Sequence, residues 1–297
     1  MTKTQMREKV AARQGFIAAL DQSGGSTPRA LHNYGIPANS YASETEMYDL
    51  VHQMRTRMMT SPAFTGEKVV GAILFQRTAE SQVEGMPTST YLWEQRGVVP
   101  FIKVDKGLAD EAEGVQLMKP MPELDALLDR SNELGIFGTK MRSVINAANP
   151  AGIAANVAQQ FEVGKQILAE GLMPILEPEI TITIDDKSEA EDLLRDEILK
   201  HLDAMPEDEQ VMLKLSLPNT ANQYKPLVDH PRTLTVVALS GGYPRAQSNE
   251  MLSRNTGMIA SFSRGFSEGL KVDMTDEAFN ATIAESIESI YRASVAG

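Results

Sequence analysis

Apolar residues along the chain follow two different spacings that alternate from one end to the other. Eight short runs rich in apolar and β-branched residues are expected to form strands: residues 16–21, 69–75, 100–105, 137–145, 174–180, 211–217, 234–240 and 257–263. Between them, apolar residues at i, i+3 and i+4 predict helices, for example over 44–59, 122–134, 153–169 and 189–202. Asn149-Pro150 is typical of a helix start and Glu170-Gly171 of a helix end. A last helix, 276–293, carries one apolar stripe.

This alternation predicts an α/β protein with a parallel sheet, and eight units without a long linker favour a closed (β/α)8 barrel, the TIM-barrel fold. No repeat or composition break divides residues 1–297, so we expect a single catalytic domain. Residues 78–97 show no helical stripe and are expected to form a long loop with local turns. A doubly wound open sheet is the alternative, but residues 21–26 lack the GxGxxG spacing of dinucleotide-binding proteins.

Several predicted strands carry charged residues on the face that should point into the barrel. In residues 211–217, the leucines share one face, while Met212, Lys214 and Ser216 share the other. Burying an ammonium group is costly unless it is paired or loses its proton, and the neutral amine is the form that attacks a carbonyl. Taken alone, Lys214 is equally compatible with a lysine that snorkels at a strand end or pairs with a carboxylate.

The same pattern recurs in other strands. The residues concerned are Asp21, Lys103 with Asp105, Lys140 with Arg142, and Glu177 with Glu179. Barrel enzymes keep their chemistry at the strand ends, so a convergent set of this size favours an active site. A position of Lys140 close to Lys214 would disfavour the charged form of the Lys214 amine. Glu177 or Glu179 could carry protons to and from the reacting groups. The resulting chemistry is amine attack, dehydration to an iminium, and use of that cation as an electron sink.

A different pattern follows the last two predicted strands. Ser240-Gly241-Gly242 comes after the seventh, and Ser261 and Arg264 come after the eighth. These two loops are the frequent phosphate site of a (β/α)8 barrel, where backbone N–H groups and a cation hold the anion. A serine followed by two glycines is by itself only a turn signal.

Composition narrows the classes of protein. The net charge is −12, which argues against nucleic acid as a partner but not against a phosphorylated metabolite. The chain has no cysteine, which excludes Cys-ligated metals, and its four histidines have no metal-site spacing, so a metal site is poorly supported. We also expect no cofactor. No apolar run is long enough to cross a membrane and the first residues are polar, which favours a cytoplasmic protein. The helix faces are compatible with a homo-oligomer.

Together these segments resemble the class I fructose-bisphosphate aldolases, in the family's order and over about four-fifths of the chain. The fragments IKVDKG, EPEI and LSGG are close to the family's motifs, and LDQSGGS, KMR and LKLSLPN are looser. The spacing between Lys214 and Pro218-Asn219, a single basic residue at Arg29, and an ending in SVAG without a tyrosine tail are similar to the short bacterial branch. The resemblance implies cleavage of fructose 1,6-bisphosphate to dihydroxyacetone phosphate and glyceraldehyde 3-phosphate, without a metal.

The resemblance also implies a role for each matching residue. Lys214 is similar to the Schiff-base lysine, and Glu177, with Glu179 beside it, to the proton acceptor. Asp21 and Lys140 resemble the groups that handle the substrate's hydroxyl protons. The matching substrate-binding residues are Lys103 and Arg142 along the cleft, Ser26 and Arg29 toward the second phosphate, and Ser240, Gly241, Gly242, Ser261 and Arg264 around the ketose 1-phosphate.

Three other readings fit parts of this pattern. A transaldolase or deoxyribose-phosphate aldolase would keep the barrel and the Schiff base but needs only one phosphate site. A phosphosugar isomerase would use Glu177 as a base without a covalent intermediate. A non-catalytic binding protein would leave the buried charges without a purpose.

Overall fold

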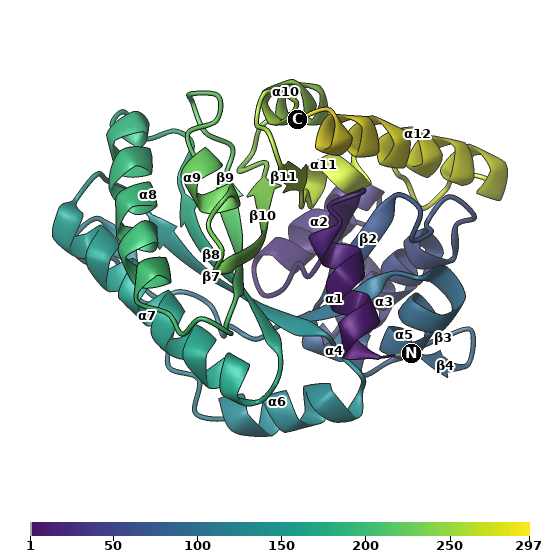
Figure 1. Ribbon diagram of the computed structural model, residues 1–297. Helices are drawn as coiled ribbons and strands as arrows, with labels where there is room; N and C mark the ends of the chain where they lie inside the picture. Colours follow the sequence, from purple (N-terminus) through teal and green to yellow (C-terminus); the bar gives the residue numbers. More distant parts are fainter. Residues whose placement is uncertain (1) are drawn as a thin grey trace.

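The computed structural model describes residues 2–297 and contains a ring of parallel strands (Figure 1). The strands follow one another around the ring in chain order: β1 (Phe16–Leu20), β2 (Val69–Leu74), β5 (Val99–Lys103), β7 (Gly138–Ile145), β8 (Met173–Ile180), β9 (Val211–Ser216), β10 (Thr233–Leu239) and β11 (Met258–Ala260). All eight predicted strands are present. The ring closes between β1 and the segment after β11, where the Ala19 amide donates a hydrogen bond to the Phe262 carbonyl at 3.4 Å. The α/β class and the (β/α)8 barrel are therefore confirmed.

Helices connect the strands and cover the outside of the barrel (Figure 1). They are α1 (Lys3–Ala11), α2 (Ser26–Tyr34), the 3-10 turn η1 (Ala38–Ser40), α3 (Glu44–Thr60), α4 (Gln76–Ala79), α5 (Thr88–Thr90), the π-helix η2 (Tyr91–Gln95), α6 (Leu124–Glu133), α7 (Pro150–Ala169), α8 (Lys187–Asp203), α9 (Lys225–Val228), α10 (Arg245–Leu252), α11 (Arg264–Ser267) and α12 (Asp276–Val295). β6 (Val115–Gln116) adds an antiparallel pair to β7.

Local sequence explains where the longest helices begin and end. The Asn149 side chain accepts hydrogen bonds from the amides of Ala151 and Gly152 and so caps α7, while Pro150 takes the first position, where no donor is needed. Gly171 follows the helix with φ +69°, a conformation that favours glycine. Both predicted ends of this helix are confirmed.

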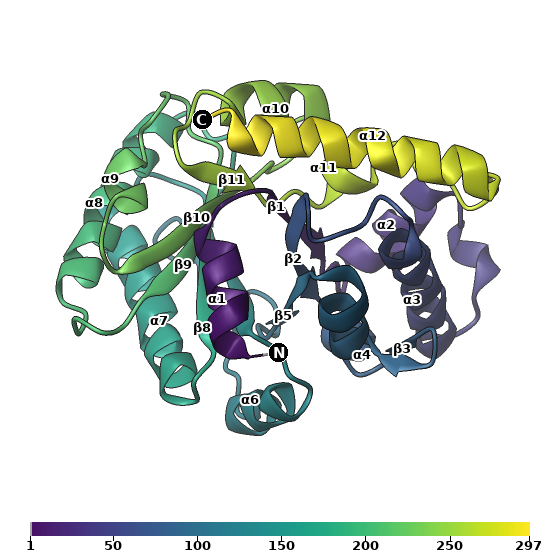
Figure 2. The same cartoon turned by 45° about the vertical axis from the view of Figure 1, so that its right-hand side comes forward.

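The two faces of each strand belong to different apolar clusters. Ile17, Val99 and Met212 point into the barrel, where they pack in one cluster with Met6 and Val10 of α1. α1 contacts β2, β5 and β10, and it lies across the end of the barrel where the strands begin (Figure 2). That end is therefore closed by apolar packing, which leaves the other end for polar side chains.

Residues 78–97 do not form the long loop that the sequence predicted. They contain the hairpin of β3 (Gln82–Val83) and β4 (Met86–Pro87), followed by α5 and η2, which buries Tyr91 and Leu92. Each element has two to five residues, which is too few for a helical or strand period to show in the sequence.

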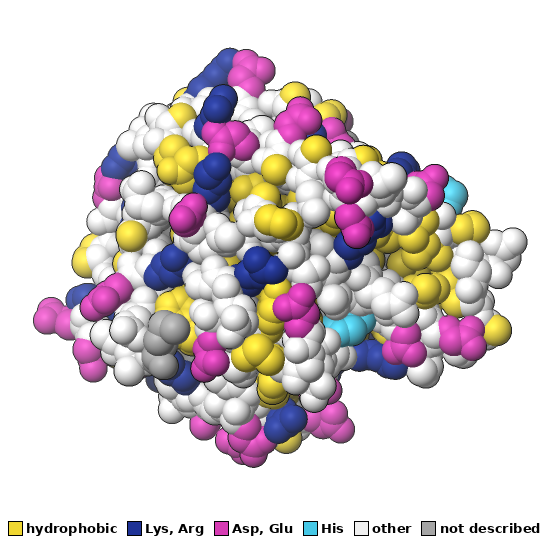
Figure 3. Space-filling model, turned by 90° about the vertical axis from the view of Figure 1, so that its right-hand side faces the viewer, with side chains coloured by type: hydrophobic (Ala, Val, Ile, Leu, Met, Phe, Trp, Pro, Cys, Tyr) yellow, Lys and Arg dark blue, Asp and Glu magenta, His cyan; other side chains and the backbone are white. Residues whose placement is uncertain are grey.

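The surface mixes charges of both signs. Figure 3 shows one face, on which lysine and arginine side chains are interspersed with aspartate and glutamate side chains. The acidic excess of the chain is not gathered into one patch on that face. Within residues 2–297, no helix combines the length and apolarity needed to cross a membrane.

Candidate active site

The charged side chains that the sequence placed inside the barrel form a layer above its apolar interior. Met212 belongs to the interior apolar cluster, and Lys214 stands two residues further along the same face of β9. Ile175 and Glu177 have the same relation on β8. Because side chains alternate along a strand, residues i and i+2 point to the same face, and the second lies one layer further along the barrel axis. The predicted orientation of Lys214 and Glu177 is therefore confirmed.

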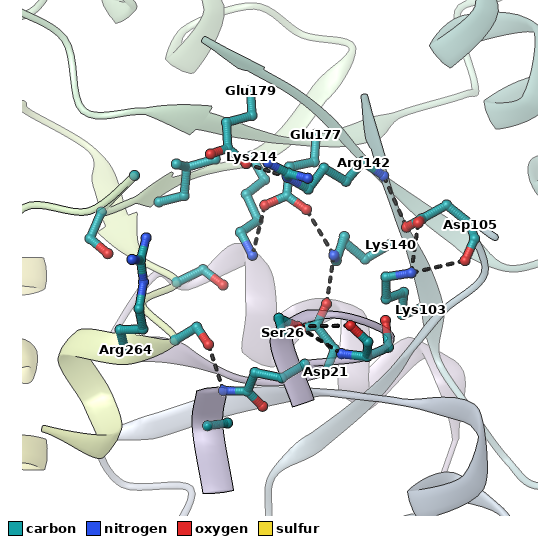
Figure 4. A pocket seen from close by; sticks show the side chains of 18 of the residues that line it. Asp21, Ser26, Lys103, Asp105, Lys140, Arg142, Glu177, Glu179, Lys214 and Arg264 are labelled. Atoms are coloured by element: carbon teal, nitrogen blue, oxygen red, sulfur yellow. Dashed lines mark hydrogen bonds and ion pairs between the residues drawn. The ribbon is translucent and has the colours of Figure 1, made fainter. Parts of the chain in front are cut away.

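Four of these side chains form a chain of alternating charge (Figure 4). Lys140 Nζ lies 2.5 Å from Asp21 Oδ2 and 2.9 Å from Glu177 Oε2. Lys214 Nζ lies 3.0 Å from the other oxygen of the same carboxylate, Glu177 Oε1. Lys140, Glu177 and Lys214 are only 3–4% exposed. Glu177 thus stands between two ammonium groups and contacts both, in a place largely closed to bulk water.

The pKa values of the first pair reflect this arrangement. Burial alone would favour the neutral form of Asp21, but the charges of Lys140 and Lys214 outweigh it, so the pKa of Asp21 lies well below its ordinary value. Burial likewise opposes the charge of Lys140, but Asp21 and Glu177 outweigh it and hold the pKa of Lys140 well above its ordinary value. Both groups are therefore ionised at neutral pH.

We expect Asp21→Asn to remove a pH-dependent part of the stability. A carboxyl group with a lowered pKa in the folded state stabilises the protein above the ordinary aspartate pKa of about 3.9, and this contribution disappears as the pH falls through the folded-state pKa. The wild type should therefore exceed the variant by about 3 kcal/mol in free energy of unfolding at pH 7. The difference should shrink steadily below about pH 4. Denaturant unfolding from pH 3 to 7 measures it, and Asp129→Asn, at an exposed aspartate, is the control. A difference that stays constant with pH would contradict this reading.

A second group of charges lines the same end of the barrel. Lys103 Nζ lies 2.6 Å from Asp105 Oδ1, and Asp105 Oδ2 accepts a hydrogen bond from the Arg142 amide at 3.1 Å. Asp105 therefore joins the ends of β5 and β7. The Arg142 side chain forms an ion pair with Glu179. Asp105 was seen on the same face as Lys103 in the sequence, and its buried position marks it as a further member of the site.

The loop after β10 has the geometry of an anion-binding turn. Gly241 has φ +61° and Gly242 has φ +131°, and a Cβ added at Gly241 would lie 2.5 Å from Ile182 Cγ2. Only glycine fits the first position without displacing its neighbour. Consecutive amides in such a conformation can converge on one anion. The Arg264 guanidinium lies beside Gly242, 3.6 Å from where its Cβ would be.

These groups line one cavity of about 430 Å³, a size typical of small-molecule sites. Every residue predicted for the site lines this cavity except Gly242. The lining residues that the sequence analysis did not single out are Gln22, Ser23, Ala30, Asn33, Gly107, Leu108, Leu239, Ser263 and Ser267. Ser263 lies two residues after Ser261 in the same loop. This proximity to a predicted site residue was the one sequence feature that pointed to Ser263.

The cavity has a positive excess in an acidic protein. Among residues 2–297, six cationic and four anionic side chains line it, whereas the whole chain carries a net charge of −12. A local excess of this sign suits a ligand with more than one negative group. In the described part of the chain, no three histidine, cysteine, aspartate or glutamate side chains are grouped so as to hold a metal ion.

Known proteins resemble this chain along almost all of its length. The model of the family described as fructose-bisphosphate aldolase class-I matches residues 4–241. A fructose-bisphosphate aldolase class 1 from Porphyromonas gingivalis is 57% identical over 295 residues, which is 99% of this chain and 100% of that protein. One of the same name from Synechocystis is 56% identical over 288 residues, covering 97% of this chain and 96% of that protein.

A solved structure agrees with the fold. It is a ternary complex of fructose-bisphosphate aldolase from Plasmodium falciparum with TRAP and a small-molecule inhibitor, and it aligns with a TM-score of 0.77 over 99% of this chain and 95% of that chain. At 18% identity, this likeness supports the barrel alone. The family model and the two relatives carry the assignment, and the predicted resemblance is confirmed: the chain belongs to the class I fructose-bisphosphate aldolase family.

Proposed function

We propose that the protein reversibly cleaves fructose 1,6-bisphosphate to dihydroxyacetone phosphate and glyceraldehyde 3-phosphate through a Schiff base on Lys214. The observation that carries the proposal is the contact of Lys214 Nζ with Glu177 Oε1 at 3.0 Å, inside a cavity with a cationic excess. A carboxylate at this distance is within hydrogen-bond reach and can accept the proton that the ammonium must lose before it attacks.

The reaction needs proton transfers at two places. Lys214 Nζ attacks the ketose C2 carbonyl, and the carbonyl oxygen leaves as water after accepting protons, with Glu177 as the carrier. The C3–C4 bond then breaks: its electron pair moves into the iminium to give an enamine, while the C4 hydroxyl loses its proton and becomes the aldehyde. Asp21 and Lys140 are assigned to that hydroxyl. Protonation of the enamine at C3 and hydrolysis of the imine release dihydroxyacetone phosphate and free Lys214.

A bisphosphate accounts for the cations that stand away from Lys214. We assign the ketose 1-phosphate to Ser240, Gly241, Ser261 and Arg264, with Gly242 supporting the turn, and the second phosphate to Ser26 and Arg29. Lys103 and Arg142 line the cleft between them, and Glu179 orients Arg142 through their ion pair. A monophosphate aldolase would leave one of these two groups without a ligand.

Reductive trapping tests the proposal. The protein is incubated with dihydroxyacetone phosphate and borohydride, digested, and mapped by mass spectrometry. We expect a stable adduct on Lys214, loss of activity only when both reagents are present, and no effect of a chelator on the untreated enzyme. A phosphosugar isomerase that uses Glu177 as a base would leave Lys214 unmodified. Loss of activity on removal of divalent metal would contradict the proposal directly.

We also propose that residues 1–297 act as one catalytic domain in the cytoplasm, with phosphorylated sugars as ligands and without nucleic acid or membrane partners. The acidic net charge and the mixed surface charges support this. A homo-oligomer remains compatible with the helices on the outside of the barrel.

A further inference from the structure

A buried arginine lies next to the site without a carboxylate partner. Arg55 of α3 is 1% exposed and forms no ion pair among residues 2–297. Its Nη1 donates to Thr78 Oγ1 at 2.7 Å, and its Nη2 donates to the Gln22 carbonyl at 2.6 Å. Burial lowers the pKa of Arg55 to about 10, so the group stays charged at neutral pH. An unpaired buried charge is costly, so a role beyond packing is expected.

Arg55 determines which way the Gln22 amide faces. A guanidinium has donors and no acceptor, so only the amide oxygen of Gln22 can face it. Arg55 Nη2 lies 3.3 Å from Gln22 Oε1, and on the other side Gln22 Nε2 lies 2.6 Å from Ser263 Oγ. The reversed amide would place an NH2 group against the guanidinium. Gln22 therefore donates to Ser263, and the Ser263 oxygen is the acceptor.

The direction of that bond leaves the Ser263 proton free. A hydroxyl has one donor, and within residues 2–297 Ser263 Oγ donates to no other group. Ser263 lines the cavity together with Ser240, Ser261 and Arg264. A hydroxyl whose oxygen already accepts a bond from within the protein is oriented to donate outward, which is what an anionic phosphate oxygen requires.

We propose that Ser263 Oγ donates a hydrogen bond to the ketose 1-phosphate, and that Arg55, acting through Gln22, is a positioning residue that holds the hydroxyl in this direction. The proposal rests on the proposed function for the location of that phosphate. The three residues form the Arg55–Gln22–Ser263 chain, which ties α3 and the loop after β1 to the loop after β11.

Ser263→Ala removes the donor at the end of this chain. A hydrogen bond to a charged group is lost in substrate and transition state alike, so we expect the KM for fructose 1,6-bisphosphate to rise about tenfold with a smaller change in kcat. Ser263→Thr, which keeps the hydroxyl, should restore most of the KM. Ser253→Ala, at a serine that does not line the cavity, is the matched control.

Gln22→Glu tests the direction of the bonds without weakening the fold. A carboxylate would pair with Arg55 and accept from Ser263, which turns the hydroxyl away from the phosphate. We expect the thermal stability to be kept or raised while the KM rises about as much as in Ser263→Ala. If the Arg55–Gln22–Ser263 chain had a purely structural role, the KM would stay unchanged. The new ion pair between Arg55 and the carboxylate introduced by Gln22→Glu would hold the loop after β1 at least as firmly.

A double-mutant cycle separates this effect from simple charge repulsion. If the change acts through Ser263, adding Gln22→Glu to Ser263→Ala should raise the KM by less than twofold, well short of the product of the single effects. Full additivity, or an unchanged KM in Ser263→Ala, would overturn the inference.

Arg55→Lys, which keeps a donor-only cation, should retain a lower KM than Arg55→Met. Borohydride trapping on Lys214 is run in parallel: its failure in the wild type overturns the proposed function, whereas normal trapping with an unchanged KM in Ser263→Ala overturns only this inference.

Discussion

Lys214→Met should lower kcat for cleavage of fructose 1,6-bisphosphate by roughly 10⁴- to 10⁶-fold, because no other group replaces the amine that forms the covalent intermediate. The fold should survive, since Glu177 keeps its contact with Lys140 at 2.9 Å when Lys214 is removed. The measurement combines steady-state kinetics with borohydride trapping, and we expect neither turnover nor an adduct at position 214. Circular dichroism checks that the variant is folded.

The control for this variant is Lys165→Met, at an exposed lysine on α7 that should leave activity and trapping as in the wild type. Lys214→Arg gives a sharper comparison, because it keeps a buried cation beside Glu177 but cannot supply a neutral amine. A folded Lys214→Met protein that kept a tenth of the wild-type kcat would rule out the Schiff base at this residue.

Lys140→Met should impair both stability and catalysis. Lys140 contacts both Asp21 and Glu177, so among residues 2–297 its loss leaves Asp21 without an ion pair and Glu177 with Lys214 alone. Breaking a buried ion pair by removing one partner costs about 3–5 kcal/mol. Loss of a group that handles substrate protons costs about 10²- to 10⁴-fold in rate. Denaturant unfolding and single-turnover kinetics measure the two effects separately.

Two further variants separate charge from chemistry. Lys140→Arg keeps the cation and should recover much of the stability without recovering the rate, because the planar guanidinium presents its donors in a different geometry from the ammonium that contacts Asp21 and Glu177. Adding Asp21→Asn to Lys140→Met removes the carboxylate that the loss of Lys140 leaves unpaired, so the double variant should be more stable than the sum of the single effects predicts. Strict additivity of the two changes in unfolding free energy would contradict the ion-pair chain.

Strand order and the inward direction of the charged side chains could be read from the sequence. Both depend on local periods: two residues separate Lys214 from Met212, and two separate Glu177 from Ile175, so each pair shares a face whatever the rest of the chain does. The barrel follows from counting eight units without a long linker. The short elements within residues 78–97 could not be predicted, because their two to five residues carry no period of their own.

The pairing of charges depends on how neighbouring strands are aligned. Arg142 is the direct strand partner of Glu177, yet its side chain pairs with Glu179, while Lys140, which is opposite Ile175, reaches Glu177. Each cation on β7 contacts a carboxylate two residues further along β8. Strand tilt and stagger in a closed barrel set this offset, and neither has a signature in a single strand.

By itself, the sequence determined the order of elements, the inward face of the strands that carry charged residues, and a set of chemical groups whose spacing matches one family, because these are properties of short segments. The tertiary structure alone decided that Glu177 contacts both Lys140 and Lys214, that α1 closes the far end of the barrel, and that Arg55 reaches Ser263 through Gln22. Those contacts join residues up to 241 positions apart, so they exist only once strand register and helix packing have brought the segments together.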